Sequence, residues 1–339
     1  MIIVRAPLRI SFVGGGTDLP DFYHQYPGRV ISTTINKFIY LIINPKQFDN
    51  TFVMKYNIVE MVKNPSEFTH DRLRAALLDA DLTKNGIEFA TFAEIPARTG
   101  LGSSSSFSVA LVKGLQALKG RAISKVSAAE EACRLEIELL KEPIGKQDQY
   151  AASFGGFNVF QFNQDNSVTI EPVLLDYNKS SALEKHLLLF YTGITRDASS
   201  VLVGQKALIN DKFETYKKMS DSVYGFRDLV QAGDIEKLAL MLHNGWLHKK
   251  SLANNISNSV IDGLYESSRA AGAWGGKILG AGGGGCLLVF APPEKHDHIR
   301  SALAKVALEG KLSSFKEIDV KFTQSGTDIL FNSHPAIKQ

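Results

Sequence analysis

A polar loop punctuated by glycine carries the residue types best suited to bind an anion. It spans residues 96–106, Pro-Ala-Arg-Thr-Gly-Leu-Gly-Ser-Ser-Ser-Ser, and leads into a segment from Phe107 to Leu118 whose apolar residues recur at helical spacing. The first N–H groups of a helix have no partner within the helix and lie at the positive end of its dipole. Glycine lets the backbone approach a ligand closely, and serine hydroxyls add donors or a magnesium ligand. The loop therefore predicts a phosphate-binding site; an ordinary serine-capped helix after a flexible turn is the alternative.

Three charged residues are candidates for a role in chemistry. Glu136 falls on the apolar stripe of a predicted helix over residues 127–140, so its carboxylate is expected either in a structural salt bridge or on a metal ion. Asp148 lies among polar neighbours just before a second helical turn. Arg9 lies inside a predicted strand, Ile2 to Val13, where an arginine faces solvent unless a carboxylate or phosphate is near.

Two further glycine-rich segments indicate close backbone contacts. Residues 14–18, Gly-Gly-Gly-Thr-Asp, end the first predicted strand, either to bring the backbone near another group or as a plain tight turn. Residues 280–285 satisfy G-x-G-x-x-G, but a dinucleotide-binding fold needs a helix after these glycines. Here an apolar strand, Cys286 to Ala291, follows, so the segment is expected to connect two strands and line a cavity. The chain contains no G-x-x-x-x-G-K-[ST] sequence, which excludes a P-loop NTPase.

The apolar patterning predicts both strands and helices around these motifs. Beyond Gly193 long amphipathic helices predominate, which places a domain boundary near residues 176–185. The predicted strands are residues 2–13, 30–35, 38–43, 52–56, 86–92, 157–162, 168–174, 186–191, 286–291 and 318–322, and the predicted helices are 72–80, 107–118, 127–140, one capped by Asp234, 260–271 and 294–308.

The composition excludes several classes of protein. A chain of 339 residues can bury a large core and form two domains, and 44% hydrophobic with 22% charged residues is typical of a globular protein. A net charge of +3 without basic runs argues against nucleic-acid binding. Two distant cysteines and scattered histidines predict neither disulfides nor a zinc site. With no signal peptide or membrane-spanning run, a reduced cytoplasmic protein is expected.

The three small-residue motifs, in this order and context, resemble those of the GHMP kinases, the family of galactokinase, homoserine, mevalonate and phosphomevalonate kinases. The resemblance spans nearly the whole chain, and its middle motif, Pro96-x-x-x-Gly100-Leu101-Gly102-Ser103-Ser104, is highly specific. It implies an α+β fold with an N-terminal ribosomal S5-like domain, residues 1–180, and a C-terminal ferredoxin-like domain, residues 181–339. It also implies that ATP lies with its phosphates on the serine loop and that the acceptor lies between the domains.

The resemblance assigns roles to individual residues. Asp148 matches the aspartate that faces the attacking hydroxyl, either as a base or as an orienting group, and Arg9 matches the arginine that pairs with it. Ser104 and Glu136 match the ligands of Mg²⁺, which bridges the phosphates of ATP. The residues expected to contact these phosphates are Gly100, Leu101, Gly102, Ser103, Ser104 and Ser105.

The same comparison bears on the acceptor. The residues expected to contact a sugar are Gly14, Gly15, Gly16, Thr17, Asp18, Gly282 and Gly283. In galactokinase the first turn reads Gly-Glu-His-Thr-Asp, so the glycines at positions 15 and 16 remove two side chains and argue against galactose. The segments at residues 5–19 and 33–37 are most similar to those of kinases for D-glycero-D-manno-heptose 7-phosphate, which implies transfer to O1 of that sugar.

Other functions within this fold stay open at this point. A fucose-type sugar 1-kinase and a mevalonate-pathway enzyme are the alternatives within the family, and a catalytically silent regulator is the alternative outside enzymes. The regulator is disfavoured because all four residues with assigned catalytic and metal-binding roles are present. A phosphorylated acceptor also needs a cation remote from ATP. Lys37, Lys146 and Arg196 are the candidates, each of which could instead be a solvated surface charge, and a homodimer is compatible with the sequence.

Overall fold

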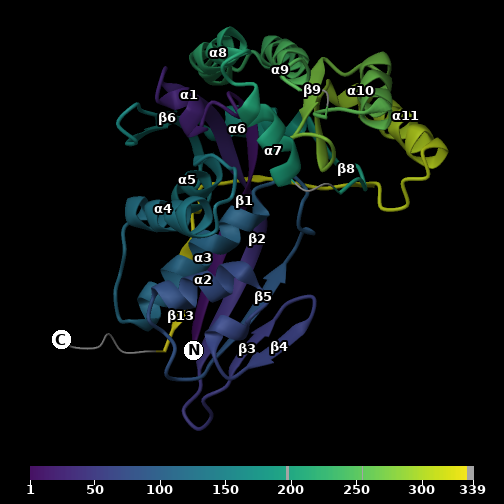
Figure 1. Cartoon of the computed structure of the whole chain (residues 1–339). Coiled ribbons are helices and arrows are strands. Elements are labelled where there is room, and N and C mark those ends of the chain that lie inside the picture. Colours follow the sequence, from purple (N-terminus) through teal and green to yellow (C-terminus); the bar gives the residue numbers. More distant parts are fainter. Residues whose placement is uncertain (196–197, 254, 334–339) are drawn as a thin grey trace.

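The computed structural model describes residues 1–195, 198–253 and 255–333 and has two sheets in two regions (Figure 1). The larger, N-terminal sheet has nine strands, with the order β13-β1-β2-β5-β3-β4 along its main path and β6, β7 and β12 joined at β2 and β6. The smaller sheet has the order β11-β8-β10-β9. The α+β prediction is therefore confirmed.

The longest strands, β1 (Ile2–Val13) and β2 (Gly28–Pro45), form the antiparallel centre of the larger sheet. β1 has the predicted bounds, but the two strands predicted over residues 30–43 are one. Their boundary is a register shift, in which Leu8 pairs with Ile35 and Pro7 pairs with Phe38. Proline has no N–H to give to the ladder, which accounts for a bulge at this point.

Helices from the N-terminal half cover one face of this sheet (Figure 1). α3 (Ser103–Leu118) packs on β1 and β2 and also contacts α4 (Lys125–Cys133) and α5 (Gln147–Phe154). The predicted single helix over residues 127–140 changes character after α4, because Arg134–Leu139 form a π-helical turn.

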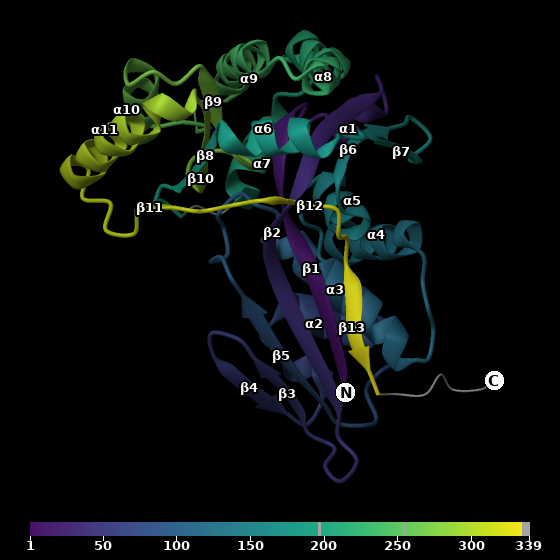
Figure 2. The ribbon, with the colours of Figure 1, turned by 180° about the vertical axis from the view of Figure 1, so that it is seen from behind.

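The C-terminal end of the chain crosses back to the first sheet (Figure 2). β12 (Phe322–Thr323) pairs with β2, and β13 (Asp328–Asn332) pairs with β1. The predicted strand over residues 318–322 is wrong for residues 318–321, which belong to no strand and link β11 to β12. Only the ends of this link bond to the sheets: Ile318 donates its N–H to the carbonyl oxygen of Leu189, and the carbonyl oxygen of Lys321 accepts from Asn36. Because β12 and β13 lie in the N-terminal sheet, a division into residues 1–180 and 181–339 stays a prediction.

None of the helices in the described ranges combines the length and apolar composition that a bilayer span requires.

The other elements largely follow the predicted pattern. The remaining strands are β3 (Phe52–Lys55), β4 (Val59–Val62), β5 (Ile87–Ala93), β6 (Phe157–Phe162), β7 (Val168–Pro172), β8 (Leu187–Tyr191), β9 (Gly275–Ile278), β10 (Cys286–Phe290) and β11 (Lys316–Glu317). The remaining helices are α1 (Pro20–Tyr23), α2 (Asp71–Asp79), α6 (Tyr177–Lys185), α7 (Ala198–Ala207), α8 (Phe213–Ala232), α9 (Ile235–Lys250), α10 (Ser259–Ala270) and α11 (His296–Glu309), with 3-10 turns at Pro65–Glu67 and Pro293–Lys295.

Candidate active site

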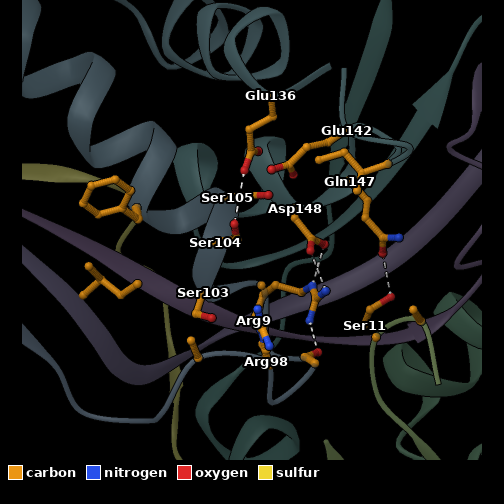
Figure 3. Close-up of a pocket in the computed structure, with 18 of the residues that line it drawn as sticks. Arg9, Ser11, Arg98, Ser103, Ser104, Ser105, Glu136, Glu142, Gln147 and Asp148 are labelled. Atoms are coloured by element: carbon orange, nitrogen blue, oxygen red, sulfur yellow. Dashed lines mark hydrogen bonds and ion pairs between the residues drawn. The ribbon is translucent and has the colours of Figure 1, made fainter. Parts of the chain in front are cut away.

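A cavity of about 1050 Å³ lies where the two regions meet, and it collects most of the residues singled out from the sequence. Figure 3 shows its charged and hydroxyl groups converging from β1, the serine loop, the π-helical turn and the start of α5. We call the lining residues Arg9, Ser104, Glu136 and Asp148 the N-terminal wall. We call Gln205, Lys249, Lys277, Gly280 and Ala281 the C-terminal wall.

The serine loop (residues 96–106) runs into α3 through a glycine and not through a serine cap. Gly102 is the N-cap residue, with a φ of 77°, and the serines from Ser103 onward form the first helical turn. Glycine is required here because its φ is positive and because a Cβ atom would lie 3.2 Å from Cγ of Arg9. Since α3 begins at Ser103, the N–H groups of its first turn have no carbonyl four residues earlier in the helix to bond. Ser103 and Ser104 line the cavity, as do Gly100, Gly102 and Ser105.

Arg9 and Asp148 form a bidentate ion pair at the centre of the site (Figure 3). Nε of Arg9 donates to Oδ1 of Asp148 at 2.8 Å, and a terminal nitrogen donates to Oδ2 at 2.7 Å. The other terminal nitrogen donates to the carbonyl oxygen of Gly100 at 2.6 Å. Because Arg9 is only 3% exposed, its guanidinium holds both the carboxylate and the serine loop in fixed positions.

Glu136 lies in the π-helical turn and is fully buried. Its Oε1 accepts from Nε of Arg72 at 3.1 Å and from Oγ of Ser104 at 3.5 Å, while Oε2 accepts from Nε2 of Gln149 at 2.6 Å. The structural ion pair that the sequence left open is thus present, and Ser104 meets the same carboxylate oxygen.

The oxygen atoms of Ser104 and Glu136 fit a magnesium ion. Mg²⁺ prefers hard oxygen ligands and commonly binds through one or two carboxylates together with the phosphates of a substrate. Within the described ranges no cluster of three or more histidine, cysteine or acidic side chains is arranged to hold a metal. An ion held by Ser104 and Glu136 would need further oxygen ligands, which the phosphates of a substrate can supply.

The turn at residues 14–18 has two parts with different roles. Gly15, Gly16 and Asp18 line the cavity, whereas Gly14 and Thr17 do not. The hydroxyl of Thr17 donates to the carbonyl oxygens of Gly14 and Arg29, both at 2.8 Å, so this half of the turn is structural. The carboxylate of Asp18 accepts from backbone N–H of Gly16 and from two nitrogens of Gln147. Burial raises the pKa of Asp18 above its ordinary value, although the bond from Gln147 opposes this shift.

The glycine loop (residues 280–285) connects two strands, as the sequence predicts, but only its first two residues line the cavity. Gly283 donates its N–H to the carbonyl oxygen of Ile256 at 2.7 Å, and a Cβ on Gly282 would lie 2.8 Å from that oxygen. A Cβ on Gly280 would lie 2.7 Å from Cα of Gly100. The two loops therefore pack backbone against backbone at Gly280, whereas Gly282 and Gly283 pack against Ile256 and do not line the cavity.

Two of the cations proposed for a substrate phosphate, Lys37 and Lys146, lie outside the cavity. Lys37 is in the β-bulge opposite Pro7, and Nζ of Lys146 donates to the carbonyl oxygen of Asn166 at 3.2 Å. Neither lysine lines the cavity, and Arg196 lies outside the described residues. Two lysines that the sequence analysis missed, Lys249 and Lys277, line it instead.

The opposite end of the cavity is more apolar and was also missed. Its lining includes Ile39, Tyr56, Phe92 and Ile95, with the amide side chain of Asn57 among them. Apolar faces flanked by a few polar groups suit a planar heterocycle. No periodic signal marks these residues, because they come from several strands and loops.

Family comparisons agree with this geometry. Residues 68–156 match the GHMP kinases N terminal domain and residues 226–308 match the GHMP kinases C terminal region, which together cover about half of the chain. Among curated proteins, the chain is 28% identical to the D-glycero-alpha-D-manno-heptose 7-phosphate kinase of Campylobacter jejuni, over 90% of this chain and 93% of that protein. It is 26% identical to the galactokinase of Pyrococcus furiosus, over 94% and 98% of the two chains.

Solved structures agree on the fold. A D-glycero-D-manno-heptose 1-phosphate kinase from Bacteroides thetaiotaomicron superposes with a TM-score of 0.80 at 22% identity, covering 98% of this chain and 100% of that one. Lactococcus lactis galactokinase, complexed with galactose, gives a TM-score of 0.76 at 17% identity over 97% and 95% of the two chains. The chain therefore has the GHMP kinase fold and belongs to the GHMP kinase family of ATP-dependent phosphotransferases that act on an alcohol group.

Proposed function

We propose that this protein transfers the γ-phosphate of ATP to O1 of D-glycero-D-manno-heptose 7-phosphate. The observation that carries the proposal is the bidentate pair of Arg9 and Asp148, held beside the first turn of α3 inside a cavity large enough for a nucleotide and a sugar. The similarity to a heptose 7-phosphate kinase over nine-tenths of the chain supports the choice of acceptor.

The nucleotide phosphates bind at the first turn of α3. The N–H groups of residues 102–105 lie at the start of α3, at the positive end of the helix dipole, where they can donate to phosphate oxygens. The base occupies the apolar end of the cavity, against Tyr56 and Phe92. This orientation leaves the C-terminal wall for the acceptor.

Ser104 and Glu136 hold Mg²⁺ together with the phosphates of ATP. When bound, the ion offsets the charge of the β- and γ-phosphates. Gln149, which donates to the other oxygen of Glu136 at 2.6 Å, fixes the direction of this carboxylate.

Asp148 accepts the proton of the O1 hydroxyl as the oxygen attacks the γ-phosphorus and the bond to the bridging oxygen of ADP breaks. Arg9 orients the carboxylate through two hydrogen bonds and adds positive charge beside the transferred phosphoryl group. The two hydrogen bonds hold both side chains in position, so little reorganisation is needed during the reaction.

Gly15 leaves room for the acceptor. A Cβ atom on Gly14 would lie 1.9 Å from the carbonyl oxygen of Arg29, and Gly16 has a φ of 100°, so the fold requires both glycines. A Cβ on Gly15 would meet only Oγ of Ser11 at 3.8 Å and Nε2 of Gln147 at 3.9 Å, both ordinary contacts. The absence of a side chain at Gly15 is therefore not needed for folding and instead enlarges the cavity.

An ADP-release assay over sugars and sugar phosphates tests the proposal. We expect the highest kcat/KM for D-glycero-D-manno-heptose 7-phosphate, with product phosphorylated at O1 by ³¹P NMR. A preference for an unphosphorylated hexose such as fucose would make the protein a fucose-type sugar 1-kinase, and turnover of mevalonate would contradict a sugar acceptor altogether. Binding of ATP without turnover of any acceptor would favour the silent regulator.

A further inference from the structure

Two lysines of the C-terminal wall are buried although they line the cavity. Lys249, at the end of α9, and Lys277, in β9, are each 5% exposed. A buried ammonium group is costly unless a partner offsets its charge, so each lysine requires an explanation.

The protein supplies these lysines with carbonyl oxygens and not with carboxylates. Nζ of Lys249 donates to the carbonyl oxygen of Gly280, and Nζ of Lys277 donates to those of Ser11 at 3.0 Å and Phe12 at 2.8 Å. Within the described ranges, no acidic side chain forms an ion pair with either ammonium group. An ammonium group has three N–H donors, so both lysines retain capacity for another acceptor.

The nearby carboxylates are already occupied. Asp148 is held by Arg9 through two hydrogen bonds, and Asp18 accepts from three N–H groups of the polypeptide. Burial, followed by the charge of Arg9, lowers the pKa of Lys249 to about 8, although Asp18 and Asp148 raise it somewhat. Burial, followed by the charges of Lys249 and Arg9, lowers the pKa of Lys277 well below its ordinary value. This part of the cavity thus has an excess of positive charge that an anion would relieve.

Resting on the proposed function, we propose that Lys249, assisted by Lys277, binds the phosphate group that the acceptor sugar already carries. The two lysines come from α9 and β9 and line the cavity with Gly15, Gly16 and Gln205, whereas the phosphates of ATP have a separate place at the first turn of α3. A sugar phosphate carries a charge of about −1.5 to −2 near pH 7 and accepts charge-assisted hydrogen bonds. The subsite explains why two lysines are buried without carboxylate partners.

The test compares Lys249→Met with Lys250→Met. Methionine keeps the length of the side chain and removes the charge. Lys250 is the matched control, because it is the next residue of α9, pairs with Asp262 at 3.0 Å and does not line the cavity. For each variant kcat/KM is measured at saturating ATP with heptose 7-phosphate and with unphosphorylated heptose, and KM for ATP is measured separately.

We expect Lys249→Met to lower kcat/KM for the phosphorylated sugar roughly 10- to 100-fold, the loss of one charge-assisted bond, and to leave the unphosphorylated sugar and KM for ATP nearly unchanged. Lys250→Met should match the wild type. Thermal unfolding should find Lys249→Met no less stable than wild type, because the substitution removes a buried charge. Lys277→Met, by the same measurements, should give a smaller loss in the same direction.

Equal losses for both sugars, no loss, or a loss confined to ATP would overturn the subsite. The subsite and the proposed function fail separately. If the wild-type protein does not turn over heptose 7-phosphate, the proposed function fails, and calorimetric binding of mannose 6-phosphate and mannose to the same variants still tests the subsite. Mannose 6-phosphate binding no tighter than mannose to the wild type, or equally well to Lys249→Met, would then contradict it.

Discussion

The two walls of the cavity differ in how their charged side chains are partnered. In the N-terminal wall, Arg9 pairs with Asp148, and Glu136 is held by Arg72 and Gln149. In the C-terminal wall, Lys249 and Lys277 have only carbonyl partners within the described chain. A charged side chain that is bonded to another side chain is held in a fixed geometry, as phosphoryl transfer requires. A buried cation that has only carbonyl partners can still bind an anionic ligand.

The glycines of the two loops also differ in role, since one loop can bind a ligand and the other packs within the protein. In the serine loop, Gly102 starts a helix and leaves N–H groups free for an anion, whereas in the glycine loop the chain continues into a strand and Gly282 and Gly285 serve packing. Similar glycine-rich sequences thus have different roles because different elements follow them. Changes in the N-terminal wall should alter kcat, and changes in the C-terminal wall should alter acceptor binding or stability.

The largest effect is expected for Asp148→Asn. The substitution keeps the shape of the side chain and one acceptor for Arg9, but it removes the charge and the base, so kcat should fall by ~10²–10⁴. Nucleotide binding, measured by calorimetry with a non-hydrolysable ATP analogue, should stay within a few-fold of wild type. A kcat within a few-fold of wild type would show that Asp148 is not the residue that accepts the proton.

The next effect tests whether the glycine loop serves packing. Gly285 has a φ of 90°, and a Cβ there would lie 2.6 Å from the carbonyl oxygen of Thr99. Gly285→Ala should lower the free energy of unfolding by roughly 2–4 kcal/mol, through backbone strain and overlap. Gly233→Ala is the control, since Gly233 has a φ of 77° but nothing within 4 Å of its Cβ position, and it should lose about 1 kcal/mol. Equal losses in urea unfolding would mean that the two loops are not in tight contact.

A smaller effect separates the metal role of Glu136 from a purely structural ion pair. Glu136→Gln and Ser104→Ala should each raise the magnesium concentration for half-maximal activity, roughly tenfold for Glu136→Gln and less for Ser104→Ala. Glu138→Gln, in the same π-helical turn but exposed, should leave the titration unchanged. If Glu136 only pairs with Arg72, its variant should instead have a lower melting temperature and a normal magnesium titration.

Local patterns predicted the N-terminal wall well and the C-terminal wall poorly. The bounds of β1 and the position of α3 follow from periodicity. The resemblance to the GHMP kinases predicted that Arg9 pairs with Asp148. Lys249 was missed because lysines in the last turn of a helix usually face solvent, and its burial depends on how α9 packs against β9. Lys277 did offer a signal, since it is a charged residue in an apolar strand that precedes the glycine loop.

Long-range packing also explains the other differences. Alternating apolar residues at 318–322 resemble a strand, but the chain there passes from one sheet to the other. Its two ends bond to different sheets, at Leu189 and at Asn36, so no continuous ladder forms. The π-helical turn that positions Glu136 has no sequence signature, because it adds one residue to an otherwise helical pattern.

The smallest expected effect is a pH dependence of acceptor binding that belongs to the C-terminal wall alone. Burial, followed by the charge of Arg9, lowers the pKa of Lys249 to about 8, whereas the carboxylates of Asp18 and Asp148 oppose this shift. The amine must be protonated to bind a phosphate, so KM for the sugar phosphate should rise a few-fold between pH 7.5 and about 8.5, whereas KM for ATP should not.

As pH rises, Lys249 should weaken acceptor binding but increase the stability of the fold. An unfolded lysine keeps its proton up to a pKa of about 10.4, so the unfolded chain binds more protons than the folded chain between that value and about 8, and this residue makes the protein more stable as pH rises through the interval. Lys249→Met should remove both trends, and Lys250→Met should keep them. An acceptor KM that rises equally in wild type and Lys249→Met would assign the pH dependence to the chemistry of the N-terminal wall instead.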